Sequence, residues 1–141
     1  MNDSFEVCLA HSLRSADRVI SQFYTDYLSS VGLRSTQYAV LRVIALSKTT
    51  TARQIQDHLV MEQATVSRAL KPLIRDGYIE VKEGSNRREK ALSLTTAGKK
   101  IYQQAKKEWS KAQAELKTRL GDESAIQLIE LSRKITDMKR T

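Results

Sequence analysis

Polar and basic side chains between residues 63 and 88 are the groups best suited to bind another molecule. Five of them share one predicted helix: Gln63, Thr65, Ser67, Arg68 and Lys71. An arginine can donate two hydrogen bonds to guanine, a glutamine amide can pair with adenine, and hydroxyl groups suit phosphates or base edges. Asn86, Arg87 and Arg88 follow, and a narrow minor groove attracts such long basic side chains. The pattern indicates contact with DNA.

Each of these groups also has a structural explanation. Ser67 or Thr65 could bond the backbone of its own helix. Arg87 and Arg88 could be a solvated charged turn. Both alternatives stay open at the level of sequence.

Two short helices are predicted to position the 63–71 face. Thr51-Ala52-Arg53-Gln54 has the spacing of a capping box, which starts a first helix with Ile55 and Leu59 inward. Residues 60–62 form a brief break. The second helix runs over 63–76 until Gly77 stops it, and its apolar residues at helical spacing are Val66, Leu70, Leu73 and Ile74.

A hairpin is predicted to follow the second helix. Ile79 and Val81 alternate with polar neighbours, and so do Leu92 and Leu94, which predicts two strands with the arginine pair at the tip. Two helices joined by a short turn and followed by a basic hairpin are the layout of a winged helix-turn-helix.

Four motifs in this region resemble the MarR family of bacterial transcriptional regulators. They are residues 63–70, 75–79, 86–88 and 94–98, in the order and spacing of that family. The resemblance covers nearly the whole chain, because the flanking helices also fit in order and length. It implies a dimer formed by the N- and C-terminal helices, with one wing arginine in the minor groove and the other bracing the loop.

Long helices flank the helix-turn-helix. Ser4 to Val31 is predicted to be one helix with a continuous apolar stripe, ended by Gly32. Its length of about 26 residues corresponds to about 39 Å, which exceeds what a small domain needs for its own core. Ser35 is predicted to cap the next helix, with Tyr38, Leu41, Ile44 and Ala45 inward.

Two further helices are predicted at the C-terminal end. Thr95 or Thr96 caps a long one that Gly121 ends, with an apolar stripe of Ile101, Ala105, Trp109, Ala112, Leu116 and Leu120. Asp122 or Ser124 caps the last one. Its apolar residues cover more than half of the circumference: Ile126, Leu128, Ile129, Leu131, Ile135 and Met138. Such a helix needs a second surface to bury against.

The expected fold class is therefore mainly α with a small β-hairpin wing, a winged helix-turn-helix inside a helical dimer platform. We expect an N-terminal dimerisation helix over 1–34, the DNA-binding region over 35–96 and C-terminal dimerisation helices over 97–141. A homodimer must place its two reading helices in major grooves about 34 Å apart, so the DNA site should be a palindrome.

Composition limits the class of protein. The chain has 141 residues and is 40% hydrophobic, which suits one globular domain. No apolar run approaches the roughly 20 residues that cross a bilayer, and Glu6 interrupts the apolar run of a signal peptide. One cysteine and two histidines disfavour a disulfide or a structural zinc site. We expect a cytoplasmic protein without cofactor, metal or membrane partner.

Charge favours a polyanionic partner. The net charge is +8, and residues 97–120 carry seven Lys or Arg against two acids. Residues 52–90 carry eight against six, so the predicted reading unit is not the most basic part. The 97–120 lysines are either a solvated helix face or a flank for the DNA backbone.

Cys8 is a candidate redox sensor. A helix N-terminus and the imidazolium of His11, one turn on, both favour a thiolate, which peroxides attack. Some relatives of the MarR type sense organic hydroperoxides through a cysteine in this helix. The alternative is a buried structural cysteine at the dimer contact.

A small aromatic ligand is the other effector that the resemblance implies, bound between platform and reading helices. Tyr38 and the first helix could line such a cleft, whereas Trp109 is expected in the core. The leading hypothesis is a repressor that such a ligand or a hydroperoxide releases from DNA. The alternative is a winged-helix protein-interaction module. An enzyme is not expected, because no nucleophile–base pair or phosphate-binding glycine loop occurs.

Overall fold

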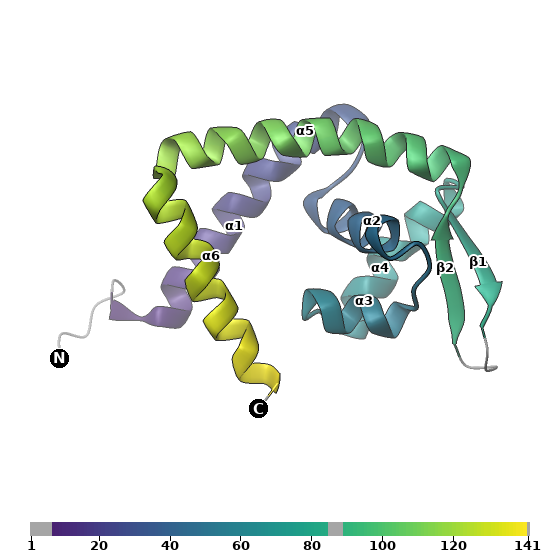
Figure 1. Ribbon diagram of the computed structural model, residues 1–141, viewed down its shortest axis with the longest axis horizontal. Helices are drawn as coiled ribbons and strands as arrows, with labels where there is room; N and C mark the ends of the chain where they lie inside the picture. Colours follow the sequence, from purple (N-terminus) through teal and green to yellow (C-terminus); the bar gives the residue numbers. More distant parts are fainter. Residues whose placement is uncertain (1–6, 85–88, 141) are drawn as a thin grey trace.

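The structure, a computed structural model, describes residues 7–84 and 89–140 and is mainly helical (Figure 1). Its elements are α1 (Leu9–Leu28), η2 (Ser29–Val31), α2 (Ser35–Ser47), α3 (Ala52–Leu59), α4 (Gln63–Arg75), β1 (Ile79–Glu83), β2 (Lys90–Leu94), α5 (Thr96–Leu120), α6 (Asp122–Asp137) and η3 (Met138–Arg140). This order confirms the predicted fold class.

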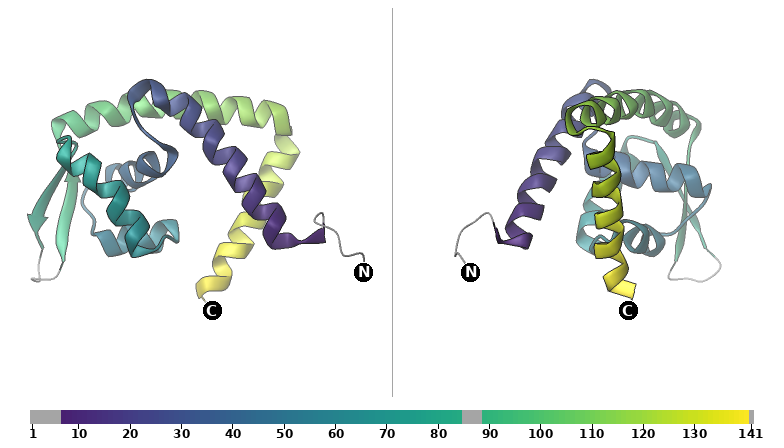
Figure 2. Two further views of the ribbon diagram at one scale, coloured as in Figure 1. Left: turned by 180° about the vertical axis from the view of Figure 1, so that it is seen from behind. Right: turned by 60° about the vertical axis from the view of Figure 1, so that its left-hand side comes forward.

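Helix α5 spans the molecule and joins two groups of elements (Figure 1). Helices α1 and α6 lie toward one end of it and, with α5, are called the platform below. Helices α2, α3 and α4 pack with the hairpin toward the other end, and they are called the reading lobe. Both groups lie on the same side of α5 (Figure 2).

The helix-turn-helix has the predicted caps. The Thr51 hydroxyl accepts the Gln54 N–H at 3.2 Å, and the Gln54 side chain accepts the Thr51 N–H at 3.1 Å, which completes the capping box. Val60 ends α3 at φ 53°, and Gly77 follows α4 at φ 81°. A left-handed residue after a helix is the usual way to end it, so both breaks occur where the sequence places them.

The first helix begins later than predicted, and the second begins one residue earlier. Helix α1 has 20 residues and starts after Cys8, so the part of the predicted helix at Val7 and Cys8 is wrong. Gly32, at φ 76°, ends the short η2 as expected. Ser35 is the first residue of α2 rather than its cap. Arg34 takes the cap position, and its N–H donates to the Gln37 side chain at 2.9 Å.

The last helix also differs at its start. Gly121, at φ 86°, occupies the cap position of α6, whereas a cap at Asp122 or Ser124 was expected. Asp122 and Glu123 instead lie in the first turn, where their charges favourably face the positive end of the helix dipole.

One hydrophobic core joins the platform to the reading lobe. Its fully buried members include Leu28 of α1, Leu41 of α2, Ile55 of α3 and Leu73 of α4. Tyr102 of α5, which the predicted stripe omits, is also buried in this core. Three residues of the apolar faces predicted for α4, β1 and α5 are exposed instead. Ile74 is 40% exposed, Val81 is 38% exposed and Leu120 is 43% exposed.

The hairpin is antiparallel, with Ile79 opposite Leu94 and Val81 opposite Leu92. Ile79 and Leu92 are buried, so one face of the hairpin closes the lobe. Thr50 adds a short bridge, in which its N–H donates to the Leu92 carbonyl at 3.0 Å and its carbonyl accepts the Leu92 N–H at 2.7 Å. The hairpin is thereby fixed to the segment just before α3.

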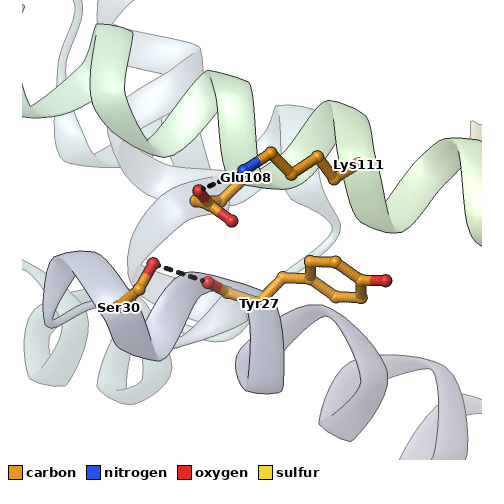
Figure 3. Close-up of polar contacts among 4 residues, drawn as sticks. All are labelled: Tyr27, Ser30, Glu108 and Lys111. Atoms are coloured by element: carbon orange, nitrogen blue, oxygen red, sulfur yellow. Dashed lines mark hydrogen bonds and ion pairs between the residues drawn. The ribbon is translucent and has the colours of Figure 1, made fainter.

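Helix α1 packs along α5. Figure 3 shows two polar contacts beside this packing: the Ser30 hydroxyl donates to the Tyr27 carbonyl at 3.1 Å, and Lys111 pairs with Glu108 at 2.9 Å. Each joins residues three positions apart, so neither links the two helices. A hydrogen bond from the Tyr24 hydroxyl to the Gln113 side chain does connect α1 to α5. Among the described residues, no helix has the length and apolarity to cross a membrane.

Candidate nucleic-acid interface

Helix α4 separates a buried face from a polar one. Val66, Ala69, Leu70 and Leu73 are buried in the core. The predicted contact residues lie on the remaining surface: Gln63, Ser67, Arg68 and Lys71 are exposed, and Thr65 is half-buried. The helical period alone produces this division, because the apolar residues recur every three or four positions.

The N-terminus of α4 is open. Glu62 precedes the helix but its side chain makes no capping bond. The Thr65 and Ser67 hydroxyls likewise make no hydrogen bond within the described part of the chain, so the expected self-bonding alternative is not observed. Unsatisfied N–H groups at a helix start favour an anion such as a phosphate.

A polar groove of about 630 Å³ lies between α1, the start of α2 and α4. Thr65 and Arg68 reach it from the predicted set. The groove also contains Arg18 of α1 and Arg34, neither of which the sequence analysis singled out. The sequence does place Arg18 on the polar side of its helix, because it lies off the apolar stripe. Nothing in the sequence indicated that Arg34 would lie beside it.

The predicted wing residues Asn86, Arg87 and Arg88 lie outside the described residues. The strands lead toward them, because Glu83 pairs with Lys90 as the last register pair. The Gly84 N–H donates to the Glu89 carbonyl at 2.9 Å beyond that pair. The role of the two arginines stays a prediction.

Comparisons with known proteins bear on this arrangement. The model of the MarR family matches residues 31–89. YwoH of Bacillus subtilis, named an uncharacterized HTH-type transcriptional regulator, is 30% identical over 115 residues, which is 82% of this chain and 84% of YwoH. This chain belongs to the MarR family. It is a DNA-binding transcriptional regulator of the MarR type.

Solved structures agree with this assignment. The M. tuberculosis regulator MosR, solved in complex with DNA, has 28% identity and a TM-score of 0.79, over 93% of this chain and 98% of MosR. A cysteine variant of MarR from E. coli, solved with operator DNA, has a TM-score of 0.83 at 22% identity, over 95% of this chain and 99% of the variant. Because the E. coli variant is only 22% identical to this chain, its likeness shows the fold alone.

This MarR-family chain also has an aromatic cavity where platform and reading lobe meet. Its volume is about 350 Å³, and its lining includes Tyr24, Tyr38, Arg42, Trp109 and Gln113. The Trp109 ring stacks on Tyr38 at 6.0 Å between centroids and on Tyr24 at 6.4 Å. Trp109 packs against the core as expected, and its half-buried ring also forms a wall of this cavity.

Polar groups in the cavity are few and constrained. Arg42 lies over the Trp109 ring, with its guanidinium carbon 5.7 Å from the centroid. Tyr24 donates a hydrogen bond to the Gln113 side chain. The buried Tyr38 hydroxyl has no hydrogen-bond partner among the described residues. Burial raises the pKa of Tyr38, and the neighbouring Tyr102 raises it further, so this phenol stays neutral.

Cys8 lies at the start of α1 and is exposed in the single chain. Its sulfur accepts the His11 N–H at 3.4 Å, so Cys8 serves as the cap of α1. The thiol is therefore accessible in this chain. Its role as a sensor, and that of His11, stays a prediction. Among the described residues, no cluster of His, Cys, Asp or Glu could hold a metal ion.

Proposed function

We propose that this MarR-family protein is a repressor that binds a palindromic operator as a homodimer, and that a small aromatic ligand or a hydroperoxide releases it. The observation that carries DNA reading is the exposed polar face of α4, a helix whose N-terminus has no side-chain cap and whose C-terminal end leads into the hairpin. Base edges are read by Gln63, Ser67 and Arg68, and Lys71 contacts the backbone. One of the wing arginines, Arg87 or Arg88, extends the contact into the minor groove, and the other braces the loop.

The apolar surface of the platform supports the homodimer. Helix α6 has no buried residue in the single chain, although Ile126 is 57% exposed and Leu131 is 59% exposed. Val19 on α1 is 69% exposed. Removing such surface from water stabilises an interface by about 25 cal/mol per Å². A second copy is the occupant that also supplies the second reading helix of a palindrome.

The aromatic cavity supports release by a small ligand. A planar ring could stack on Trp109 and Tyr38, and an acidic substituent would meet Arg42. The cavity lies between α1, α2 and α5, so a bound ring stabilises one orientation of the reading lobe against the platform. The ligand lowers DNA affinity if that orientation no longer matches the spacing of the grooves.

The exposed thiol of Cys8 supports release by an oxidant. Its thiolate would attack one peroxide oxygen, giving a sulfenic acid and an alcohol. A larger, more polar group at this helix start would change the packing of α1 in a dimer. Because both effectors act on the platform, both alter the distance between the reading helices.

The test is fluorescence anisotropy of the reduced protein against the DNA that flanks its own gene, across a range of salt. We expect one dimer per palindrome and affinity that falls steeply with salt, because neutralised phosphates release counterions. Arg88→Ala should weaken binding and reduce the salt dependence. Weak binding without preference over random DNA, also after genome-wide site selection, would favour a protein-interaction module instead.

A hydroperoxide pulse separates the two release mechanisms. Loss of binding that a Cys8→Ser variant resists would identify Cys8 as the sensor. Unchanged binding after the pulse would reject the oxidant, and titration with aromatic acids would then test the cavity. A Trp109→Leu variant should lose the response to such acids and keep its affinity for DNA.

A further inference from the structure

The polar groove between platform and reading lobe gathers three arginines from three separate elements. Arg18 comes from α1, Arg34 precedes α2, and Arg68 comes from α4. None of the three forms an ion pair with a carboxylate among the described residues. Three guanidinium groups that line one groove give it a positive potential, which favours an anion.

The rest of the groove is lined by neutral donors and contains no carboxylate. The polar lining residues are Ser21, Gln22, Thr25, Ser35, Thr36, Gln37 and Thr65. Two acids of α1 lie next to the groove and are engaged with its residues. Asp17 accepts from the Ser21 hydroxyl at 3.2 Å, and Asp26 accepts from the Gln22 amide at 2.8 Å. The chemistry of the lining suits an oxyanion.

We propose that this groove is an oxyanion site whose ligand is a backbone phosphate of the operator, held by Arg18, Arg34 and Arg68. This inference rests on the proposed function, because it needs DNA at α4. Guanidinium groups bind phosphate with pairs of parallel hydrogen bonds, and hydroxyl and amide groups can satisfy the remaining oxygens. The site adds Arg18 and Arg34 to the residues that contact DNA.

The position of the groove has a consequence for regulation. Arg18 belongs to the platform, whereas Arg68 belongs to the reading helix. A phosphate held by both bridges the two parts and favours one distance between them. Phosphate contacts fix the register of a protein on DNA. The same contact thereby makes DNA affinity sensitive to any movement of α1 relative to α4.

The test compares Arg18→Gln and Arg34→Gln with the matched control Arg14→Gln, which lies on α1 outside the groove. Glutamine keeps the length and polarity but loses the charge. Each lost phosphate contact makes the negative slope of log K against log salt less steep by about 0.9, so a dimer that loses the phosphate in both grooves should have a slope smaller in magnitude by up to about 2. The loss should be similar for all operator sequences, and the control should bind as the parent does.

A second measurement addresses the source of the anion. Inorganic phosphate is titrated into the DNA-free protein at constant ionic strength, and Tm is followed. A rise in the parent that both groove variants lack supports the oxyanion site. If the salt slopes do not change but phosphate still raises Tm selectively, the site holds a free anion and the DNA assignment is overturned. If neither the salt slopes nor the Tm values differ between the parent and the groove variants, the oxyanion site is overturned.

Failure of the proposed function gives a different result. A parent that binds no operator would refute DNA reading, and the phosphate titration would still decide whether the groove is an oxyanion site. Circular dichroism and Tm without phosphate verify that each variant is folded. Arg34→Gln should fold normally, because only the backbone N–H of Arg34 bonds the Gln37 side chain.

Discussion

Arg68 and Lys71 are exposed neighbours on α4 with different predicted roles. Arg68→Ala should cost about 1–3 kcal/mol of operator binding and, if the side chain reads a guanine, relax specificity at one position per half-site. Lys71→Ala should weaken binding to all sequences equally, because it removes a phosphate contact. Fluorescence anisotropy with operators that differ by a single base distinguishes a loss of specificity from a uniform loss of affinity. Arg14→Ala on α1, outside the groove, is the control. A uniform loss for Arg68→Ala would assign that arginine to the phosphate groove alone.

The buried phenol of Tyr38 predicts a stability change at high pH. Its folded-state pKa is raised above the ordinary value of 10.0, mainly by burial. The unfolded chain therefore loses this proton first, and the contribution of Tyr38 is complete below pH 10 and is lost as the pH rises above it. Urea unfolding at several pH values should show a smaller decrease for Tyr38→Phe than for the parent.

The same substitution tests the unpaired hydroxyl. Because the Tyr38 hydroxyl has no partner among the described residues, Tyr38→Phe should cost little stability at neutral pH. Tyr27→Phe on the half-buried face of α1 is the matched control. An equal pH dependence in all three proteins would contradict the assignment to Tyr38.

At the scale of the elements, the start of α5 is bonded to the turn that follows the reading helix. The Thr95 hydroxyl donates to the Gly77 carbonyl at 2.6 Å and accepts the Gly98 N–H at 3.0 Å. The Thr95 N–H donates to the Tyr78 carbonyl at 3.1 Å. A Cβ at Gly98 would lie 2.0 Å from the Tyr78 carbonyl oxygen. The start of α5 and the turn after α4 are therefore in contact through backbone atoms.

Substitutions at this junction should destabilise the fold in proportion to the contact that each removes. Gly98→Ala should cost at least about 1–3 kcal/mol, because the backbone must move. Thr95→Val should cost about 0.5–2 kcal/mol through the lost cap, and Thr95→Ser should restore most of it. Urea unfolding measures both. The exposed neighbour Thr96→Val is the control, and an equal effect there would reject the specific role of Thr95.

For the whole molecule, the exposed apolar face of α6 predicts assembly. Leu131→Asp combined with Ile135→Asp should convert a dimer to monomers, because a carboxylate cannot be buried unpaired at low cost. Operator affinity should fall by orders of magnitude, since a monomer contacts one half-site. Sedimentation velocity measures the assembly. Gln127→Asp on the polar side of α6 should remain dimeric, and a monomeric parent would refute the homodimer.

Local features of this protein were determined by sequence alone. The Thr51 capping box, the Gly77 stop and the pairing of the two strands appear as predicted, although Val81 is exposed where the alternation would bury it. Each depends on hydrogen bonds, backbone angles or side-chain directions within a few residues, so a short stretch contains the full cause. The polar face of α4 follows for the same reason, because the helical period assigns each residue to a side.

Only the tertiary structure decided which distant residues meet. Arg18, Arg34 and Arg68 share a groove because α1 and α4 both pack on α2, and no local pattern encodes that packing. Trp109 becomes a cavity wall and Ile74 stays exposed for similar reasons. The exposure of a side chain depends on the shape of the surface opposite it. That surface is formed by residues far away in the chain, so spacing predicts a face and packing decides its neighbour.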